Sequence, residues 1–344
     1  MDELLEKSMD ELKAYISAMG EKPFRASQLY QYLVKGVPFE EMTTLPLSLR
    51  SELAKKALPL SLKIHAAYPS KIDGTVKLLY DLPDGNLIEG VLMRYHYGYT
   101  LCVSTQVGCK MGCLFCASTL GGCVRSLSAS EMLSQVVCAN RYLGDKGRVG
   151  HVVLMGSGEP FDNYNNVIRF LNEVRREDGL SVGLRNVSLS TCGLVPEMIR
   201  FADENLPVTL SVSLHAPNDE IRRQIMPIAK TYAISQVIEA CRLYIKKTGR
   251  RVIFEYALID GINADTLHAY QLSNLLRNMQ CHVNVIPLNS VPERGLRGVS
   301  EKQVSAFLKA LEEKHISATR RREMGDDIEG ACGQLRRHTM EGNT

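Results

Sequence analysis

Three cysteines lie close together in the sequence, Cys109, Cys113 and Cys116, with three and then two residues between them. Thiolates at this spacing can bind one inorganic centre. A structural zinc site needs four ligands, usually as two separated pairs, and no fourth ligand is obvious near this triplet. A four-iron cluster held by three cysteines keeps one iron open. The spacing therefore favours a [4Fe-4S] cluster over zinc or plain buried cysteines.

An open iron could chelate the amino and carboxylate groups of S-adenosylmethionine (SAM). One electron from the cluster would then break a carbon–sulfur bond and yield a 5′-deoxyadenosyl radical. Phe115, directly before the last cysteine, fits the pattern of radical SAM proteins, which favour an aromatic residue there. The triplet thus predicts radical chemistry.

The pattern of apolar residues predicts the strands and helices that position this loop. Short β-branched runs alternate with longer stretches of helical periodicity from about residue 97 onward. The predicted strands are Tyr99–Thr105, His151–Met155, Asn186–Ser190, Thr209–Leu214, Val252–Ile259 and His282–Leu288. The predicted helices are Ala129–Leu143, Tyr164–Glu177, Ser235–Lys247 and Thr266–Met279. Repeated strand–helix units indicate a parallel sheet, and six of them predict an open, partial (β/α)6 TIM-like barrel.

Polar residues follow several of these strands, at the edge where α/β folds place their chemistry. The second strand is followed by the turn Gly156-Ser-Gly158-Glu159-Pro160. Its glycines would let backbone carbonyls approach the amino group of SAM, and Glu159 would add a negative charge near that group. The other polar strand ends are Ser190-Thr191, Ser213-Leu214-His215 and Asn289. Each could be a simple strand cap, but their shared placement favours a ligand site.

Three further residues stand out. Cys102 lies in the first barrel strand, and Cys332 lies between glycines near the C-terminus, where a mobile loop could carry its thiol into a cleft. Glu89 interrupts an apolar strand and is either a surface residue or a general base. Cys102 could equally be a small core residue. Cys123, Cys138, Cys192, Cys241 and Cys281 are interpreted as structural.

Three domains are predicted. Residues 1–75 form a small helical N-terminal domain punctuated by prolines, residues 76–96 a β-hairpin linker closed by Pro83-Asp-Gly-Asn86, and residues 97–344 the barrel with the loop of Cys332. The N-terminus lacks the features of a signal peptide, and no apolar run is long enough to cross a membrane. Ten cysteines without an export signal favour a reducing cytoplasm. The net charge of +3 neither requires nor excludes nucleic acid.

The motifs resemble those of the bacterial dual-specificity RNA methyltransferases of the RlmN type, a radical SAM family. The resemblance covers nearly the whole chain. Its motifs are Cys102–Gly122, Gly156–Phe161, Ser213–Asn218, Val285–Asn289 and Asp327–Leu335.

This resemblance implies a reaction that consumes two SAM molecules. One methylates Cys332; the radical from the other takes a hydrogen from that methyl group, and the resulting carbon radical adds to carbon 2 of an adenine. Cys102 then resolves the protein–RNA adduct by forming a disulfide with Cys332, and the family's general base falls on Glu89. The family's SAM contacts fall on Gly158, Glu159, Ser190, Ser213, Leu214, His215 and Asn289.

The implied partners are 23S rRNA, tRNA that is modified next to its anticodon, and an electron donor such as flavodoxin or ferredoxin. The protein is expected to be a monomer. Candidate RNA contacts are the basic clusters Lys246-Lys247 with Arg250-Arg251, Arg320–Arg322 and Arg336–His338, and the N-terminal residues Lys22, Arg25 and Lys35. Three alternatives stay open: a Cfr-type enzyme that methylates carbon 8, a radical SAM activase that acts on a protein, and a zinc-binding RNA module.

Overall fold

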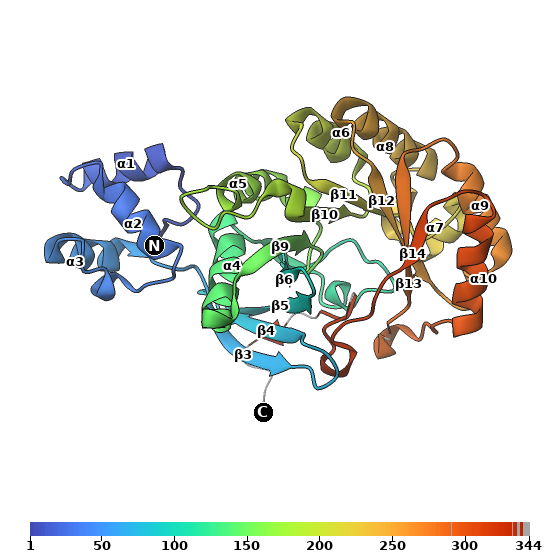
Figure 1. Cartoon of the computed structure of the whole chain (residues 1–344), viewed down its shortest axis with the longest axis horizontal. Helices are drawn as coiled ribbons and strands as arrows, with labels where there is room; N and C mark the ends of the chain where they lie inside the picture. Colours follow the sequence, from blue (N-terminus) through green and yellow to red (C-terminus); the bar gives the residue numbers. More distant parts are fainter. Residues whose placement is uncertain (290, 332, 336–337, 340–344) are drawn as a thin grey trace.

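The structure is a computed structural model that describes residues 1–289, 291–331, 333–335 and 338–339. One large twisted sheet dominates it (Figure 1), with eleven strands among the described residues. Its main path runs in the order β14-β13-β12-β11-β10-β9-β6-β5-β4-β3. Neighbours from β14 to β6 pair in parallel, whereas β6, β5, β4 and β3 pair antiparallel. The sheet therefore has a parallel barrel part and an antiparallel extension.

The parallel part confirms the six predicted strands. They are β6 (Gly98–Cys102), β9 (Val149–Leu154), β10 (Val187–Thr191), β11 (Thr209–Ser213), β12 (Val252–Leu258) and β13 (Cys281–Pro287), and the short β14 (Ala318–Arg320) follows β13. The helices of this part are α4 (Ala129–Leu143), α5 (Tyr164–Val174), α6 (Val195–Glu204), α7 (Asp219–Ile225), α8 (Ile234–Thr248), α9 (Thr266–Leu275) and α10 (Glu301–Glu312). The strand–helix alternation is that of a partial α/β barrel.

Local sequence explains where these helices begin and end. Ser128 caps α4, since its hydroxyl accepts from the Glu131 amide while the Glu131 carboxylate accepts from the Ser128 amide. The α8 helix ends at Gly249, which adopts a left-handed conformation with φ 66°. Strands β10 and β11 carry Leu189, Leu210 and Val212 into a core that excludes water.

The antiparallel extension contains β3 (Lys63–Pro69), β4 (Val76–Asp81) and β5 (Asn86–Tyr95). The predicted hairpin at residues 76–96 is confirmed as β4–β5, but it is continuous with the main sheet through β5 and β6. The backbone of β15 (His338–Thr339) pairs with the start of β5. A separate hairpin, β7 (Gln106–Gly108) with β8 (Cys123–Ser126), encloses the cysteine triplet.

The helical N-terminal part is shorter than predicted. Its helices are α1 (Met9–Ala18), α2 (Arg25–Leu33) and α3 (Leu47–Lys56), and the strands β1 (Asp2–Glu3) and β2 (Ala57–Leu58) pair beside them. The expectation that residues up to 75 are helical is wrong beyond Lys56, because residues 63–69 join the main sheet as β3. Only residues 63–66 of this stretch alternate between polar and apolar side chains, and the strand lies half-exposed at the edge of the sheet. Of these helices, α1 lies on the side of α5 (Figure 1), where Arg169 of α5 pairs with Glu11.

Candidate functional site

The cysteine triplet lies in a loop that folds back on itself. Cys109 follows β7, and its amide donates to the carbonyl of Gly122 at 2.9 Å. The Thr119 hydroxyl lies 2.8 Å from the carbonyl of Cys116 and 3.2 Å from that of Cys113. Gly108 has φ 76°, and a Cβ there would lie 2.0 Å from the Gly122 carbonyl oxygen. The loop therefore requires glycine at its entrance.

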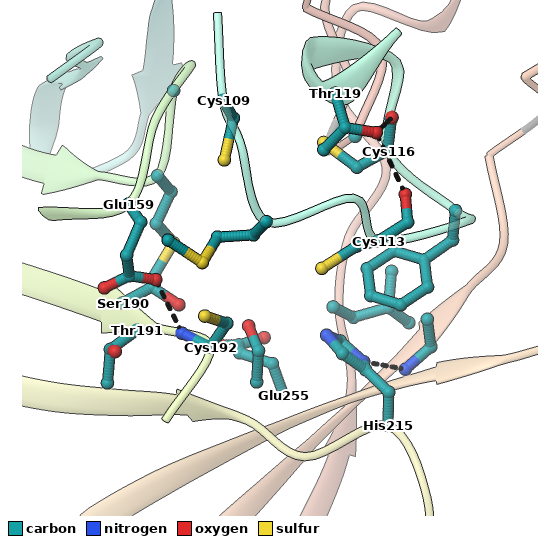
Figure 2. A pocket seen from close by; sticks show the side chains of 18 of the residues that line it. Cys109, Cys113, Cys116, Thr119, Glu159, Ser190, Thr191, Cys192, His215 and Glu255 are labelled. Atoms are coloured by element: carbon teal, nitrogen blue, oxygen red, sulfur yellow. Dashed lines mark hydrogen bonds between the residues drawn. The ribbon is translucent and has the colours of Figure 1, made fainter. Parts of the chain in front are cut away.

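All three thiols face one cavity (Figure 2), whose empty volume is about 910 Å³ including its open mouth. The carboxyl ends of the parallel strands form its opposite wall, as strand-end chemistry requires. Its lining includes Cys109, Cys113, Cys116, Gly156, Gly158, Glu159, Ser190, Ser213, His215 and Asn289.

The thiols suit a polynuclear metal group. Burial raises the pKa of Cys109 to about 12 and raises that of Cys113 as well, so binding a metal would release protons from them. Among the described residues, no three His, Cys, Asp or Glu side chains converge closely enough to bind one metal ion. Three thiols on the wall of one cavity are the ligand set of a [4Fe-4S] cluster that keeps one iron open.

The turn after β9 is held tightly against the cysteine side of the barrel. Gly158 has φ 110°, and a Cβ there would lie 2.6 Å from Thr105 Oγ1; a Cβ on Gly156 would lie 2.7 Å from Ser104 Oγ. Both glycines line the cavity, so a bound ligand can approach their backbone.

Glu159 lies in the same wall, but its carboxylate already accepts hydrogen bonds from two backbone amides. Its two oxygens accept from the amides of Cys192 at 2.7 Å and Phe161 at 3.1 Å. Burial raises the pKa of Glu159, while the Cys192 hydrogen bond opposes that shift. Glu159 therefore fixes the end of β10, in addition to any charge it offers a ligand. Cys192, which we expected to be only structural, lines the cavity.

His215 lies deep in the cavity and is neutral. Its Nδ1 accepts from the Ala257 amide at 2.9 Å, and burial lowers its pKa to about 3. The hydrogen bond leaves the proton on Nε2. Its ring meets that of Phe115 edge-on, with the centroids 4.4 Å apart. Its backbone has φ 53°, and the Asn263 side chain donates to its carbonyl at 2.7 Å.

The other predicted SAM contacts divide into two groups. Ser190, Ser213 and Asn289 line the cavity with the rest. Leu214 is fully buried and is absent from the lining; its amide donates to the Glu255 carbonyl. The carbonyl of Leu214 accepts from Arg222, a fully buried residue that also donates to the carbonyl of Cys192 at 2.7 Å. Arg222 thus joins the ends of β10 and β11.

An ion pair at the cavity wall was missed by the sequence analysis. Glu255 of β12 accepts from Arg321 at 3.3 Å and from the Asn284 amide group at 3.1 Å. Glu255 is buried, and both members of the ion pair line the cavity. A single acidic residue within the apolar run 252–259 is a signal comparable to that of Glu89, and it could have been recognised.

A second cavity, of about 690 Å³ with its mouth, adjoins the first. The two share Cys116, Met155, Gly156, Ile286, Asn289, Arg321 and Gly333. Cys102 lines the second cavity, together with Val91 and Met93 of β5 and with Ala331 and Gly333 of the C-terminal region. Cys332 itself lies outside the described residues, as do Arg336 and Arg337. The structure describes nine of the ten cysteines, Cys102 among them.

Glu89 is buried on β5 beside this region, and it pairs with Lys77 at 3.3 Å. It lies two residues before Val91 on the strand, so both side chains point to the same face of the sheet. Removing one partner of such a buried pair costs about 3 kcal/mol of folding free energy. Glu89 is not among the residues that line either cavity.

Few of the predicted basic clusters approach the cavities. Arg321 and Arg322 line the second cavity, whereas Arg320 pairs with Glu301 and Glu323. Lys247 pairs with Asp203, and Arg25 with Glu21, on other surfaces. Among the helices described, none is long and apolar enough to cross a membrane.

Known proteins resemble the chain over its full length. Residues 103–272 match the Radical SAM superfamily, and residues 2–58 match the ribosomal RNA large subunit methyltransferase N-terminal domain. A probable dual-specificity RNA methyltransferase RlmN of Alkaliphilus oremlandii is 50% identical over 98% of both chains. A protein of the same description from Clostridium tetani is 48% identical, over 100% of this chain and 98% of its own.

A solved structure has the same fold. The crystal structure of a radical SAM methyltransferase from Sphaerobacter thermophilus superposes with a TM-score of 0.94 and 41% identity, over 97% of this chain and 98% of that one. Identity at this level over whole chains, together with a cavity that gathers the three thiols opposite the strand ends, fixes the family. The chain belongs to the RlmN family of the radical SAM superfamily.

Proposed function

We propose that the protein methylates carbon 2 of an adenine in RNA, with 23S rRNA and tRNA as substrates. The observation that carries the proposal is the junction of two cavities, one walled by the cluster cysteines and the other by Cys102. The relatives that are described as dual-specificity RNA methyltransferases support RNA as the substrate class. An enzyme that modifies rRNA and tRNA works in the cytoplasm, where we place this protein.

In the first cavity, Cys109, Cys113 and Cys116 would bind the [4Fe-4S] cluster, and Gly158, Ser190, Ser213 and Asn289 would contact SAM. When bound, the cluster and SAM supply a 5′-deoxyadenosyl radical. Phe115, within the cluster loop, packs edge-on against the buried, neutral His215, and this contact would help to position the loop. Leu214 would act through its backbone, because its side chain is buried away from the cavity.

In the second cavity, the residues would handle the methyl group and the base. Carbon 2 of adenine is a poor nucleophile, so a carbon radical attached to a protein sulfur avoids a direct displacement on SAM. We assign this methyl carrier to Cys332, whose neighbours Ala331 and Gly333 line the cavity. Methylating Cys332 would consume one SAM and generating the radical a second.

Cys102 and Glu89 would complete the reaction. We assign to Cys102 the release of the RNA adduct by forming a disulfide with Cys332, and its buried position in the second cavity supports this role. Glu89 would remove the proton from carbon 2, with Lys77 as its ion-pair partner. A disulfide formed in each turnover requires a reductant, and a donor such as flavodoxin or ferredoxin would supply electrons to the cluster.

The test is anaerobic turnover of the reconstituted protein with SAM, a reductant and either 23S rRNA or tRNA, with product nucleosides identified by mass spectrometry. We expect 2-methyladenosine. A product of 8-methyladenosine would assign the protein to the Cfr type. Release of 5′-deoxyadenosine without RNA methylation would indicate another substrate, such as a protein, and would contradict the assignment of Cys332.

A further inference from the structure

The residues on both sides of Cys332 are attached to the rest of the molecule at two separate places. We call the described residues 324–331 and 333–335 the C-terminal segment. Its first part binds the β3–β4 loop: the Asp327 carboxylate accepts from the Ser70 hydroxyl at 2.7 Å and from the Lys71 amide at 2.8 Å, and the Gly325 amide donates to Asp73 at 3.1 Å. The Lys71 and Ser70 hydrogen bonds lower the pKa of Asp327.

The last part of the segment binds the residues directly after the cluster cysteines. The Ala117 amide donates to the Gly333 carbonyl at 2.7 Å, and the Ser118 hydroxyl donates to the Leu335 carbonyl at 2.7 Å. Gly333 has φ 85°, and a Cβ there would lie 3.0 Å from the Phe115 carbonyl oxygen. The segment therefore lies against the backbone of the cluster loop.

Ser118 also contacts the turn after β9. Its hydroxyl lies 3.1 Å from that of Ser157, which is between the two cavity glycines Gly156 and Gly158. Ser118 is 4% exposed. If its hydrogen bonds were broken, water could not reach the hydroxyl to replace them. One buried hydroxyl thus joins the cluster loop, the turn after β9 and the C-terminal segment.

We propose that Ser118 and Asp327 are positioning residues that hold the C-terminal segment in register with the first cavity. The inference rests on the proposed function, which places the methyl carrier within this segment. Ser118 fixes the segment to the cluster side, and Asp327 fixes it to the antiparallel side of the sheet. When either attachment is loosened, SAM is still cleaved but less RNA is methylated for each SAM cleaved. The reason is that the radical forms while the methyl carrier is misplaced.

The experiment compares Ser118→Ala, Asp327→Ala and a matched control, Ser130→Ala. Ser130 is also buried and shares a 2.7 Å hydrogen bond with another hydroxyl, that of Ser61, but it lies on α4. The measured quantity is 5′-deoxyadenosine released per methylated adenine. We expect it to rise about tenfold in the two segment variants, since a small misplacement of reacting groups can cost about a hundredfold in rate. Ser130→Ala leaves it unchanged.

Hydrogen–deuterium exchange of the cluster-loaded protein, measured without SAM or RNA, gives a readout that does not depend on activity. Peptides covering 324–335 exchange faster in Ser118→Ala and Asp327→Ala and at the wild-type rate in Ser130→Ala. Asp327 is exposed, so its variant folds even where Ser118→Ala fails to. An unchanged ratio or unchanged exchange in Asp327→Ala overturns the proposal. Absence of methylated adenine in the wild type instead contradicts the proposed function, while the exchange still tests the two attachments.

Discussion

The two adjoining cavities are built in different ways. The first collects residues from the carboxyl ends of parallel strands, such as Gly158, Ser190 and Ser213, and closes them with one loop of three cysteines. The second lies between the antiparallel strands β5 and β6 and a segment much later in the chain, with Ser118 and Leu335 in contact across 217 residues. The first cavity is thus formed mainly by the repeated strand–helix units of the barrel, and the second by contacts between distant parts of the sequence.

This difference matches a division of chemical work. A cofactor shared by a whole superfamily suits a site that the barrel itself provides. A site for one substrate needs walls beyond the strand ends of the barrel, and here β5 and the C-terminal segment would supply them.

The largest effect is expected from Cys113→Ala in the first cavity. Loss of a cluster ligand lowers bound iron and abolishes 5′-deoxyadenosine release, by well over the roughly hundredfold that loss of an outer-shell partner can cause. Iron analysis and SAM cleavage measure the two effects. Cys138→Ala, at a buried cysteine on α4, is the control and keeps wild-type iron. Full iron in the Cys113 variant would refute the assignment of the ligands.

The next effect is expected from Cys102→Ser in the second cavity. Iron content and SAM cleavage persist, because Cys102 does not line the first cavity. Release of methylated RNA fails, and a covalent protein–RNA adduct accumulates, which denaturing electrophoresis with labelled RNA detects. Normal multiple turnover by this variant would remove Cys102 from the mechanism.

The sequence predicted the first cavity well because its signals are local. Strand periodicity and the cysteine spacing located the three thiols and most of the polar strand ends, and the six predicted barrel strands lie within a few residues of their predicted bounds. Glu255, Arg321 and Cys192, which also line this cavity, were not recognised as residues of this site. The predicted helical part failed at residues 63–69, since a half-exposed edge strand has weak periodicity and its pairing with β4 is a tertiary contact.

The second cavity could not be predicted in the same way. Cys102, Glu89 and Cys332 were assigned through motif resemblance, and no periodicity places β5 beside residues 324–335. The first cavity has the same limit at one place, because its ion pair of Glu255 and Arg321 joins β12 to a residue 66 positions later, and only the folded sheet brings the two together. Charged residues inside apolar strands mark such sites but do not reveal their partners.

A smaller effect is expected from Gly158→Ala. The positive φ and the short approach to Thr105 destabilise the protein by about 3 kcal/mol in total and weaken SAM binding about tenfold. Gly85→Ala, at φ 80° with nothing within 4 Å, controls for backbone strain alone and costs about 1 kcal/mol. Urea denaturation and SAM titration distinguish the two. Equal losses in both variants would mean that close packing at Gly158 is unimportant.

The smallest effect is expected from Arg322→Ala at the mouth of the second cavity. Loss of one phosphate contact lowers RNA affinity by less than about tenfold. It also reduces the number of salt ions released on binding, read from the slope of log affinity against log salt concentration, by about one. Arg320→Ala is the control, because Arg320 already pairs with Glu301 and Glu323. Binding titrations at several salt concentrations measure both. An identical salt dependence in wild type and Arg322→Ala would exclude this contact.

The most direct test of the division between the two cavities is one anaerobic experiment that counts two products, 5′-deoxyadenosine and methylated adenine, for the wild type, Gly158→Ala and Cys102→Ser. We predict that Gly158→Ala lowers both products in parallel. We predict that Cys102→Ser still forms 5′-deoxyadenosine but releases no methylated RNA. If Cys102→Ser instead loses both products in parallel while retaining iron, the two cavities do not perform separate steps and the account is wrong.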